Sequence, residues 1–155
     1  MTYRISGLPM LPFAPLFDLS DDALADRCAV RVTADADRGF PCRVSLVDAD
    51  KGDALILLNH VSHDVATPYR TAYAIYVRAA ARAPEPYVDR TPPVFDGRQL
   101  SLRGFDRDGM LRGALIAPPD EADGVIRTLL DRDEIAYIHA HNAAHGCFAA
   151  RIDRN

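Results

Sequence analysis

Hydrophobic and polar residues alternate in several short segments of the chain, which is the pattern of half-buried β-strands. In segment 29–33, Val30 and Val32 alternate with Arg31 and Thr33, and segment 43–47 shows the same alternation. A continuous apolar run over 54–59 instead predicts a strand that is covered on both faces. These segments predict that the first part of the chain is rich in strands.

Two hairpins are predicted in the second half of the chain. Segments 99–105 and 110–116 flank Asp106-Arg107-Asp108-Gly109, and an Asp-Gly pair between alternating segments is a strong turn signal. Segments 135–141 and 147–152 form the second predicted hairpin, with residues 142–146 as its loop.

Two helices are predicted between the strands. Ser20 is placed as the N-cap of a short helix over 21–27, and Asp120 as the cap of a second helix. The second helix carries a core-facing stripe with helical spacing, formed by Ala122, Val125, Ile126, Leu129 and Leu130.

Hairpins that follow one another, with few helices between them, predict an α+β fold. We expect an antiparallel or mixed sheet of about seven strands with two helices packed on one face. Prolines over 79–94 predict an extended loop, and neither flank is long enough to fold alone. The sequence of 155 residues therefore predicts a single domain over 1–155.

The last hairpin holds most of the residues that can carry chemistry. Side chains alternate faces along a strand, so Tyr137, His139 and His141 share one face. If His141 lies opposite Cys147, then Cys147 and Arg151 join the same face. The opposite, apolar face would hold Ile138, Ala140, Phe148, Ala150 and Ile152.

Four interpretations of this polar face remain open. The first interpretation is that this face is the solvated side of an amphipathic strand pair. The second is that it forms a pocket for a small anion. The anion pocket would use His139, His141 and Arg151, with Arg43 or Arg70 from other strands, and Tyr137 as a lining residue.

The other two interpretations involve metal or thiol chemistry. His139 and His141 could hold a metal ion with His145 or Cys147 as a third ligand, although the spacing is unspecific. His60 and His63 could contribute from the end of an earlier strand. Alternatively, Cys147 beside His141 has the outline of a nucleophile and its base.

Charge and cysteine content exclude several classes of protein. The formal net charge is −4, with acids and bases interspersed, which argues against a nucleic-acid partner. No apolar stretch is long enough for a membrane span, and the early apolar run is broken by prolines, unlike a signal peptide. Three cysteines without a CxxC pair predict reduced thiols and a cytoplasmic location.

The basic residues are almost all arginine: of 18 Lys and Arg residues only Lys51 is lysine. Codon usage in a GC-rich bacterial genome accounts for this excess. Arginines that hold anions through two parallel hydrogen bonds are the functional alternative.

Several blocks of sequence together resemble a known family. They are Arg4-Ile5-Ser6-Gly7-Leu8, Gly39-Phe40-Pro41-Cys42-Arg43-Val44-Ser45-Leu46, Leu57-Leu58-Asn59, Pro68-Tyr69-Arg70, Tyr137-Ile138-His139-Ala140-His141-Asn142 and Gly146-Cys147-Phe148-Ala149-Ala150-Arg151. In this order they resemble the bacterial family called domain of unknown function 1203, over essentially the whole chain. The resemblance implies a bacterial, single-domain protein and assigns no activity to any residue.

We therefore expect a protein that binds a small anionic molecule, as a binding protein or an enzyme. The candidate site residues are Arg43, Arg70, Tyr137, His139, His141, Cys147 and Arg151. A non-catalytic module that forms a homodimer is the first alternative, and a metal-dependent enzyme using His139 and His141 is the second. The sequence requires no cofactor.

Overall fold

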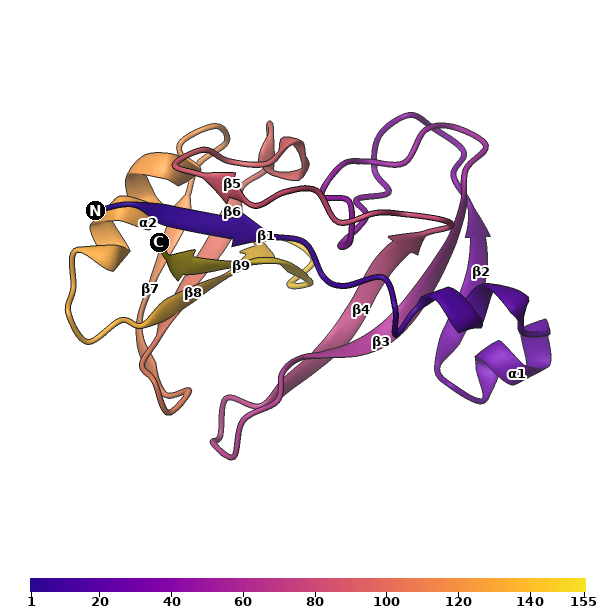
Figure 1. Ribbon diagram of the computed structural model, residues 1–155, viewed down its shortest axis with the longest axis horizontal. Helices are drawn as coiled ribbons and strands as arrows, with labels where there is room; N and C mark the ends of the chain where they lie inside the picture. Colours follow the sequence, from indigo (N-terminus) through magenta and orange to yellow (C-terminus); the bar gives the residue numbers. More distant parts are fainter.

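The computed structural model describes residues 1–155 and places nine strands in two antiparallel sheets (Figure 1). The larger sheet has the order β5-β1-β9-β8-β6-β7. These strands are β5 (Tyr87–Val88), β1 (Tyr3–Ser6), β9 (Phe148–Arg154), β8 (Tyr137–Asn142), β6 (Leu100–Phe105) and β7 (Leu111–Ala117). The smaller sheet consists of β2 (Ala29–Thr33), β3 (Ala54–His63) and β4 (Thr71–Arg78), in that order.

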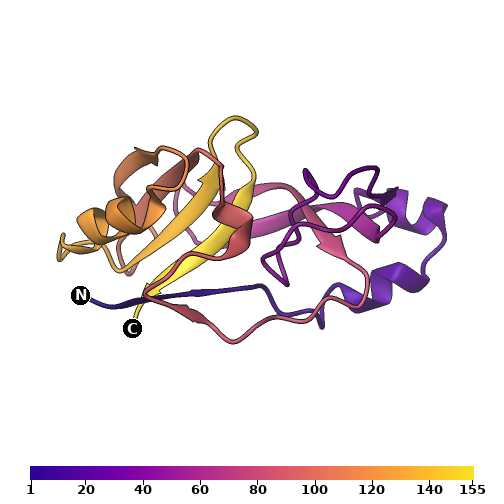
Figure 2. The same cartoon turned by 90° about the horizontal axis from the view of Figure 1, so that it is seen from above.

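The predicted α+β class is confirmed, but the expected single sheet of about seven strands is wrong. The helices also do not share one face: α2 (Ala122–Leu130) contacts β6 and β7, whereas α1 (Asp21–Ala25) contacts β2 of the smaller sheet. Seen from above, α2 and α1 lie at opposite ends of the molecule (Figure 2). Local patterning marks strands without stating which strands pair, so it could not separate the two sheets.

Each sheet has its own hydrophobic core. The predicted stripe on α2 is confirmed, because Ala122, Ile126, Leu129 and Leu130 are buried against the larger sheet in a cluster of 18 residues. A second cluster of 11 residues covers the smaller sheet, together with α1 and the 3-10 helix η1 (Ala14–Asp18). Phe148 of β9 belongs to this second cluster, so the last hairpin also packs against the smaller sheet.

Segment 43–47 is not a strand, contrary to its alternating pattern. It is part of a buried turn: Leu46 N–H donates to the Cys42 carbonyl at 3.0 Å, and Leu46 has a φ of 55°. Residues 41–46 are all buried, on both sides of the turn. Because polar and apolar residues of this turn are buried alike, the alternation does not mark the two faces of a strand.

The ends of the other elements depend on local contacts. Ser20 Oγ accepts a hydrogen bond from Ala23 N–H, which confirms the predicted cap of α1. Asp120 does not cap α2: Glu121 is the N-cap residue, and the Asp120 carboxylate accepts a hydrogen bond from Gly97 N–H at 2.7 Å. The predicted loop over 79–94 also contains β5 and the start of the 3-10 helix η2 (Pro93–Phe95).

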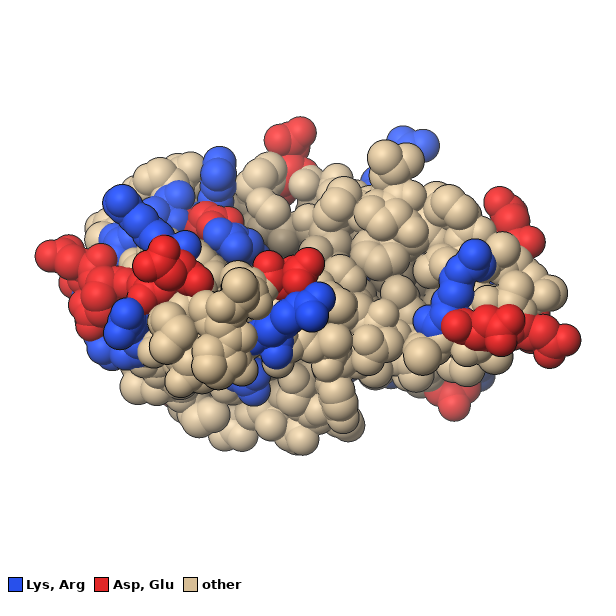
Figure 3. Space-filling view, turned by 90° about the horizontal axis from the view of Figure 1, so that it is seen from below, with Lys and Arg blue, Asp and Glu red and all other residues tan.

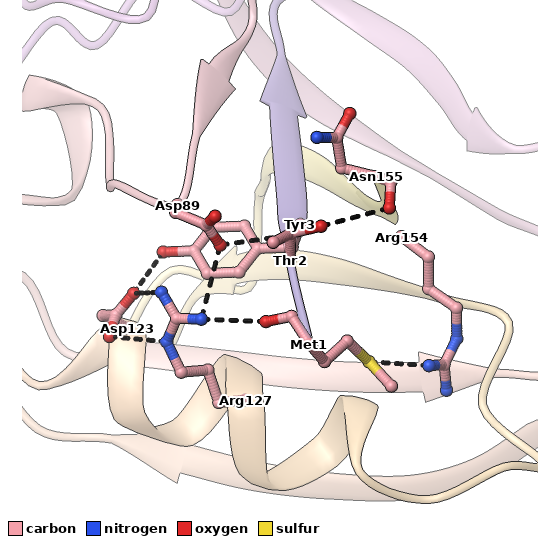
Figure 4. Close-up of polar contacts among 8 residues, drawn as sticks. All are labelled: Met1, Thr2, Tyr3, Asp89, Asp123, Arg127, Arg154 and Asn155. Carbon is pink, nitrogen blue, oxygen red and sulfur yellow. Dashed lines mark hydrogen bonds and ion pairs between the residues drawn. The ribbon is translucent and has the colours of Figure 1, made fainter.

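A polar network joins the two chain ends to α2 (Figure 4). The hydroxyl of the buried Tyr3 donates to Asp123 at 2.6 Å, and Arg127 donates to both oxygens of that carboxylate at 3.0 Å. Arg127 also donates to the Met1 carbonyl at 2.9 Å and to Asp89 at 3.3 Å. This network holds β1 against the helix that covers the larger sheet.

Charged side chains of both signs lie interspersed on the face drawn in Figure 3, mostly toward the two ends of the molecule. None of the helices has the length and apolar character needed to cross a membrane.

Candidate functional site

The histidine face of β8 is buried, on the side of the larger sheet opposite α2. Tyr137, His139 and His141 lie on this face as predicted, and the side chains of His139 and His141 are each 2% exposed. Arg151 of β9 lies directly opposite His139, which confirms its predicted place on the same face. The face is therefore a packed surface and not the solvated side of a strand pair.

The hairpin register differs from the prediction along its whole length: His139 lies opposite Arg151 instead of Ala149, and Tyr137 lies opposite Asp153. A β-bulge between Ala140 and His141 places His141 opposite Phe148 instead of Cys147. A bulge adds one unpaired residue, which turns every later side chain to the other face. The Phe148 ring therefore lies on the histidine face, 5.1 Å from the His139 ring centroid and 5.9 Å from that of His141. Its expected place on the apolar face is wrong.

His63, at the end of β3, is brought to the same face from the smaller sheet. Its Nε2 lies 2.7 Å from the Tyr137 hydroxyl, and its Nδ1 lies 2.9 Å from the Tyr69 carbonyl. A carbonyl only accepts, so Nδ1 carries the proton and Nε2 accepts from Tyr137. His60 does not join this group, because its ring packs against Phe13 at 5.7 Å.

A cavity of about 260 Å³ opens onto this face, and we call it the histidine cavity. The residues that line it include His63, Tyr69, Arg103, Phe105, His139 and His141. It lies where the β3–β4 and β6–β7 loops approach each other, with Thr67 Oγ1 donating to the Gly109 carbonyl at 3.1 Å (Figure 1). No acidic residue lines it.

Arg103 is the cation of the histidine cavity, and the sequence reasoning missed it. It lies on β6 directly opposite His139, so the two side chains share a face. The only hydrogen bond of its side chain is to Ser101 Oγ at 3.4 Å, and it forms no salt bridge. Finding it from the sequence would have required knowing that β6 is the neighbour of β8.

Burial keeps His139 and His141 neutral. It lowers the pKa of His139 to about 3, and the neighbouring charge of Arg151 lowers it further. Burial also lowers the pKa of His141 to about 4, against the opposing effect of its hydrogen bond to the Gly146 carbonyl. That bond, at 2.9 Å, places the proton of His141 on Nδ1 and leaves a lone pair on Nε2. The buried Nδ1 of His139 has no hydrogen-bond partner.

Two of the predicted arginines lie outside this cavity. Arg151 stacks its guanidinium over the Tyr137 ring at 3.9 Å and donates to Asp153 at 2.9 Å. Arg70 is exposed and pairs with Asp64 at 2.8 Å. Both cations are therefore already engaged at the surface.

Arg43 and Cys147 belong to a second cavity, of about 480 Å³, which we call the thiol cavity. Arg43 is 1% exposed, and it donates to the Cys147 sulfur at 3.3 Å. His145 also lines this cavity. The expected pair of Cys147 with His141 does not form, because the bulge turns the two side chains apart.

The metal interpretation gains no support from the geometry. His139 and His141 have ring centroids 6.5 Å apart, and His145 lines the other cavity. No group of three or more His, Cys, Asp or Glu side chains is arranged to hold a metal ion.

Comparison with known proteins gives one match. The family model described as Protein of unknown function (DUF1203) matches residues 39–154, which include both cavities' residues on β8 and β9. Neither a curated protein nor a solved structure matches the chain. Because the family model covers most of the sequence, the chain belongs to this family of proteins of unknown function.

Proposed function

We propose that the protein binds a small hydroxylated carboxylate in the histidine cavity. The observation that carries the proposal is Arg103, a guanidinium that faces the cavity and has no carboxylate partner. Arginine stays charged in proteins, and its planar fork matches a carboxylate. Because no acidic side chain lines the cavity, an anionic ligand would supply the negative partner of the Arg103 guanidinium.

The histidines define the rest of the ligand. Neutral His141 keeps its Nδ1 proton on the Gly146 carbonyl, so its Nε2 can only accept a hydrogen bond. A ligand hydroxyl would supply the missing donor. The aromatic rings of Tyr69 and Phe105 bound a space that suits a molecule of few atoms.

The experiment compares three small probes of similar size. Glycolate carries the charge and the hydroxyl, acetate carries only the charge, and glycolamide carries only the hydroxyl. Each is titrated into protein with ¹⁵N-labelled histidine, and the side-chain nitrogen shifts of His139 and His141 are followed. We expect glycolate to bind most tightly, with the shifts concentrated on these two rings.

Two arginine variants decide which cation holds the ligand. Arg103→Gln should weaken glycolate binding about 10- to 100-fold, since hydrogen bonds to charged groups contribute about 1.5–3 kcal/mol. Arg151→Gln is the matched control, because this arginine also lies directly opposite His139, on β9 instead of β6, but is engaged with Asp153. Equal loss in both variants, or binding of glycolamide as tight as that of glycolate, would reject the proposal.

We also infer a bacterial cytoplasmic protein. All three cysteines are free, which supports a reducing compartment. The family match to residues 39–154 and the resemblance described above support a bacterial source.

Self-association is the second candidate function. β7 pairs only with β6, and its residues Leu115 and Ile116 are 41% and 54% exposed. An exposed apolar edge strand is a surface on which a second copy could add its own strand. Sedimentation velocity of the wild type and of Ile116→Lys tests this: a monomer in both rejects the dimer.

A further inference from the structure

The thiol cavity holds a second candidate site, separate from the proposed anion site. Arg43 is almost fully buried and donates to the Pro41 carbonyl at 2.7 Å, to the Phe148 carbonyl and to the Cys147 sulfur. It forms no salt bridge with any carboxylate. A buried cation normally has an anionic partner, and Cys147 is the only one of its three hydrogen-bond partners that can become negative.

A second donor is directed at the same sulfur. The Asn142 Nδ2 group donates to Cys147 Sγ at 3.2 Å, while its buried Oδ1 has no hydrogen-bond partner. Two N–H donors on one sulfur favour negative charge on it, which is the form of a thiol that attacks electrophiles. Local fold geometry maintains this arrangement, because Asn142 N–H donates to the Cys147 carbonyl at 2.9 Å across the hairpin loop.

The cavity next to the sulfur has room for a reactant. Its volume is about 480 Å³, and Leu57, Tyr73 and Ile75 form part of an apolar wall. Arg98 and Gln99 also line it, and no acidic side chain does. Cys147 itself is partly exposed, so a small molecule can reach the sulfur.

We propose that Cys147 is a nucleophile that reacts with small, carboxylate-bearing electrophiles in the thiol cavity. In this step the sulfur loses its proton to solvent and forms a bond to an electrophilic carbon. The bond from that carbon to its leaving group breaks, and the leaving group departs with the electron pair. The guanidinium of Arg43 sets the preference for negatively charged reactants.

The experiment uses two reagents that differ mainly in charge. Iodoacetate and iodoacetamide both alkylate thiols with loss of iodide, and only iodoacetate carries a carboxylate. Rates at each cysteine are measured by peptide mapping, with the exposed Cys28 as the internal reference. We expect the ratio of the iodoacetate rate to the iodoacetamide rate to be several-fold higher at Cys147 than at Cys28.

Two variants connect this preference to the cavity. Asn142→Asp replaces a donor on the sulfur by a carboxylate, and it should lower the ratio at Cys147 to that of Cys28 or below. Asn155→Asp adds the same charge at an exposed position near the C-terminus, away from the cavity and from Cys28, and it should leave the ratio unchanged. Both variants avoid the buried Arg43, whose replacement would endanger folding.

The remaining outcomes overturn the proposal. Equal ratios at Cys147 and Cys28 would show no preference for anions. A Cys147 that reacts more slowly than Cys28 with both reagents would not be an activated nucleophile. A raised ratio that Asn142→Asp does not change would place its cause elsewhere. None of these results bears on glycolate binding in the histidine cavity.

Discussion

The hydroxyl of Tyr137 donates a hydrogen bond of 2.7 Å to Nε2 of His63, joining the larger sheet to the smaller one. The two residues are 74 positions apart in the chain, and His63 is 3% exposed. His63 lines the histidine cavity, so the bond holds one wall of that cavity in place. It therefore couples the relative position of the two sheets to the geometry of the site.

Removal of this hydroxyl should destabilise the protein. Tyr137→Phe leaves the buried Nε2 of His63 without its donor, and such a loss costs about 1–3 kcal/mol. Urea unfolding followed by circular dichroism measures the change in the free energy of unfolding. Tyr69→Phe is the matched control, because the Tyr69 carbonyl, not its hydroxyl, contacts His63. Equal effects of the two variants would contradict the assigned role of the Tyr137 bond.

The buried histidines should make stability depend on pH in mildly acidic solution. The pKa values of His139 and His141 are lowered to about 3 and about 4, whereas an unfolded histidine titrates near about 6.5. Below pH ~6.5 the unfolded chain therefore binds more protons than the folded one. Stability is fully present above this pH and falls as the pH drops toward the folded-state values.

The size of this effect can be measured between pH 7.5 and 5. Each histidine contributes a slope of up to about 1.4 kcal/mol per pH unit once its unfolded form is protonated. The half-buried His60, whose pKa is also lowered by burial, adds to the slope with the same sign. His139→Gln should reduce the slope relative to the wild type. A stability that does not change over this range would show that the histidines are not held neutral.

Two glycine positions should respond in opposite directions to replacement by alanine. A Cβ at Gly7 would lie 2.0 Å from the Val44 carbonyl oxygen, so the backbone next to Arg43 would have to move. We expect Gly7→Ala to destabilise by about 1–3 kcal/mol or more. Gly124 lies in α2 with nothing within 4 Å of its added Cβ, so Gly124→Ala should stabilise by about 0.5–1 kcal/mol.

Thermal unfolding of both glycine variants checks this prediction. If Gly7→Ala leaves the melting temperature unchanged, the Val44 carbonyl in the buried turn at 41–48 does not lie against Gly7. Because that turn carries Arg43, the same variant should also change the reactivity of Cys147.

The sequence predicted the local part of the site. Alternation along 137–142 placed Tyr137, His139 and His141 on one face, and the hairpin placed Arg151 with them. The observed faces agree although the predicted register does not, because a shift of two residues in β9 keeps each side chain on the same face. These inferences need only the two-residue period of a strand and the position of one turn. The cap at Ser20 and the stripe on α2 were predicted correctly for the same reason, since each depends on a few neighbouring residues.

Relationships between distant segments were not predictable in this way. Arg103 faces His139 because β6 pairs with β8, and His63 arrives from the other sheet. Strand partners are chosen by packing over the whole chain, and the pattern of one strand does not name its neighbour. Arg103 lies outside every block of the family resemblance, so no sequence motif pointed to it.

The sequence by itself determined the α+β class, the short elements and the shared face of the last hairpin, because these follow from contacts between residues near in the chain. The tertiary structure decided that there are two sheets, and that Phe148 turns onto the histidine face through a bulge. It also placed Cys147 with Arg43 instead of His141. One extra residue in a strand turns every later side chain to the other face. The position of this bulge depends on how both sheets pack against the last hairpin.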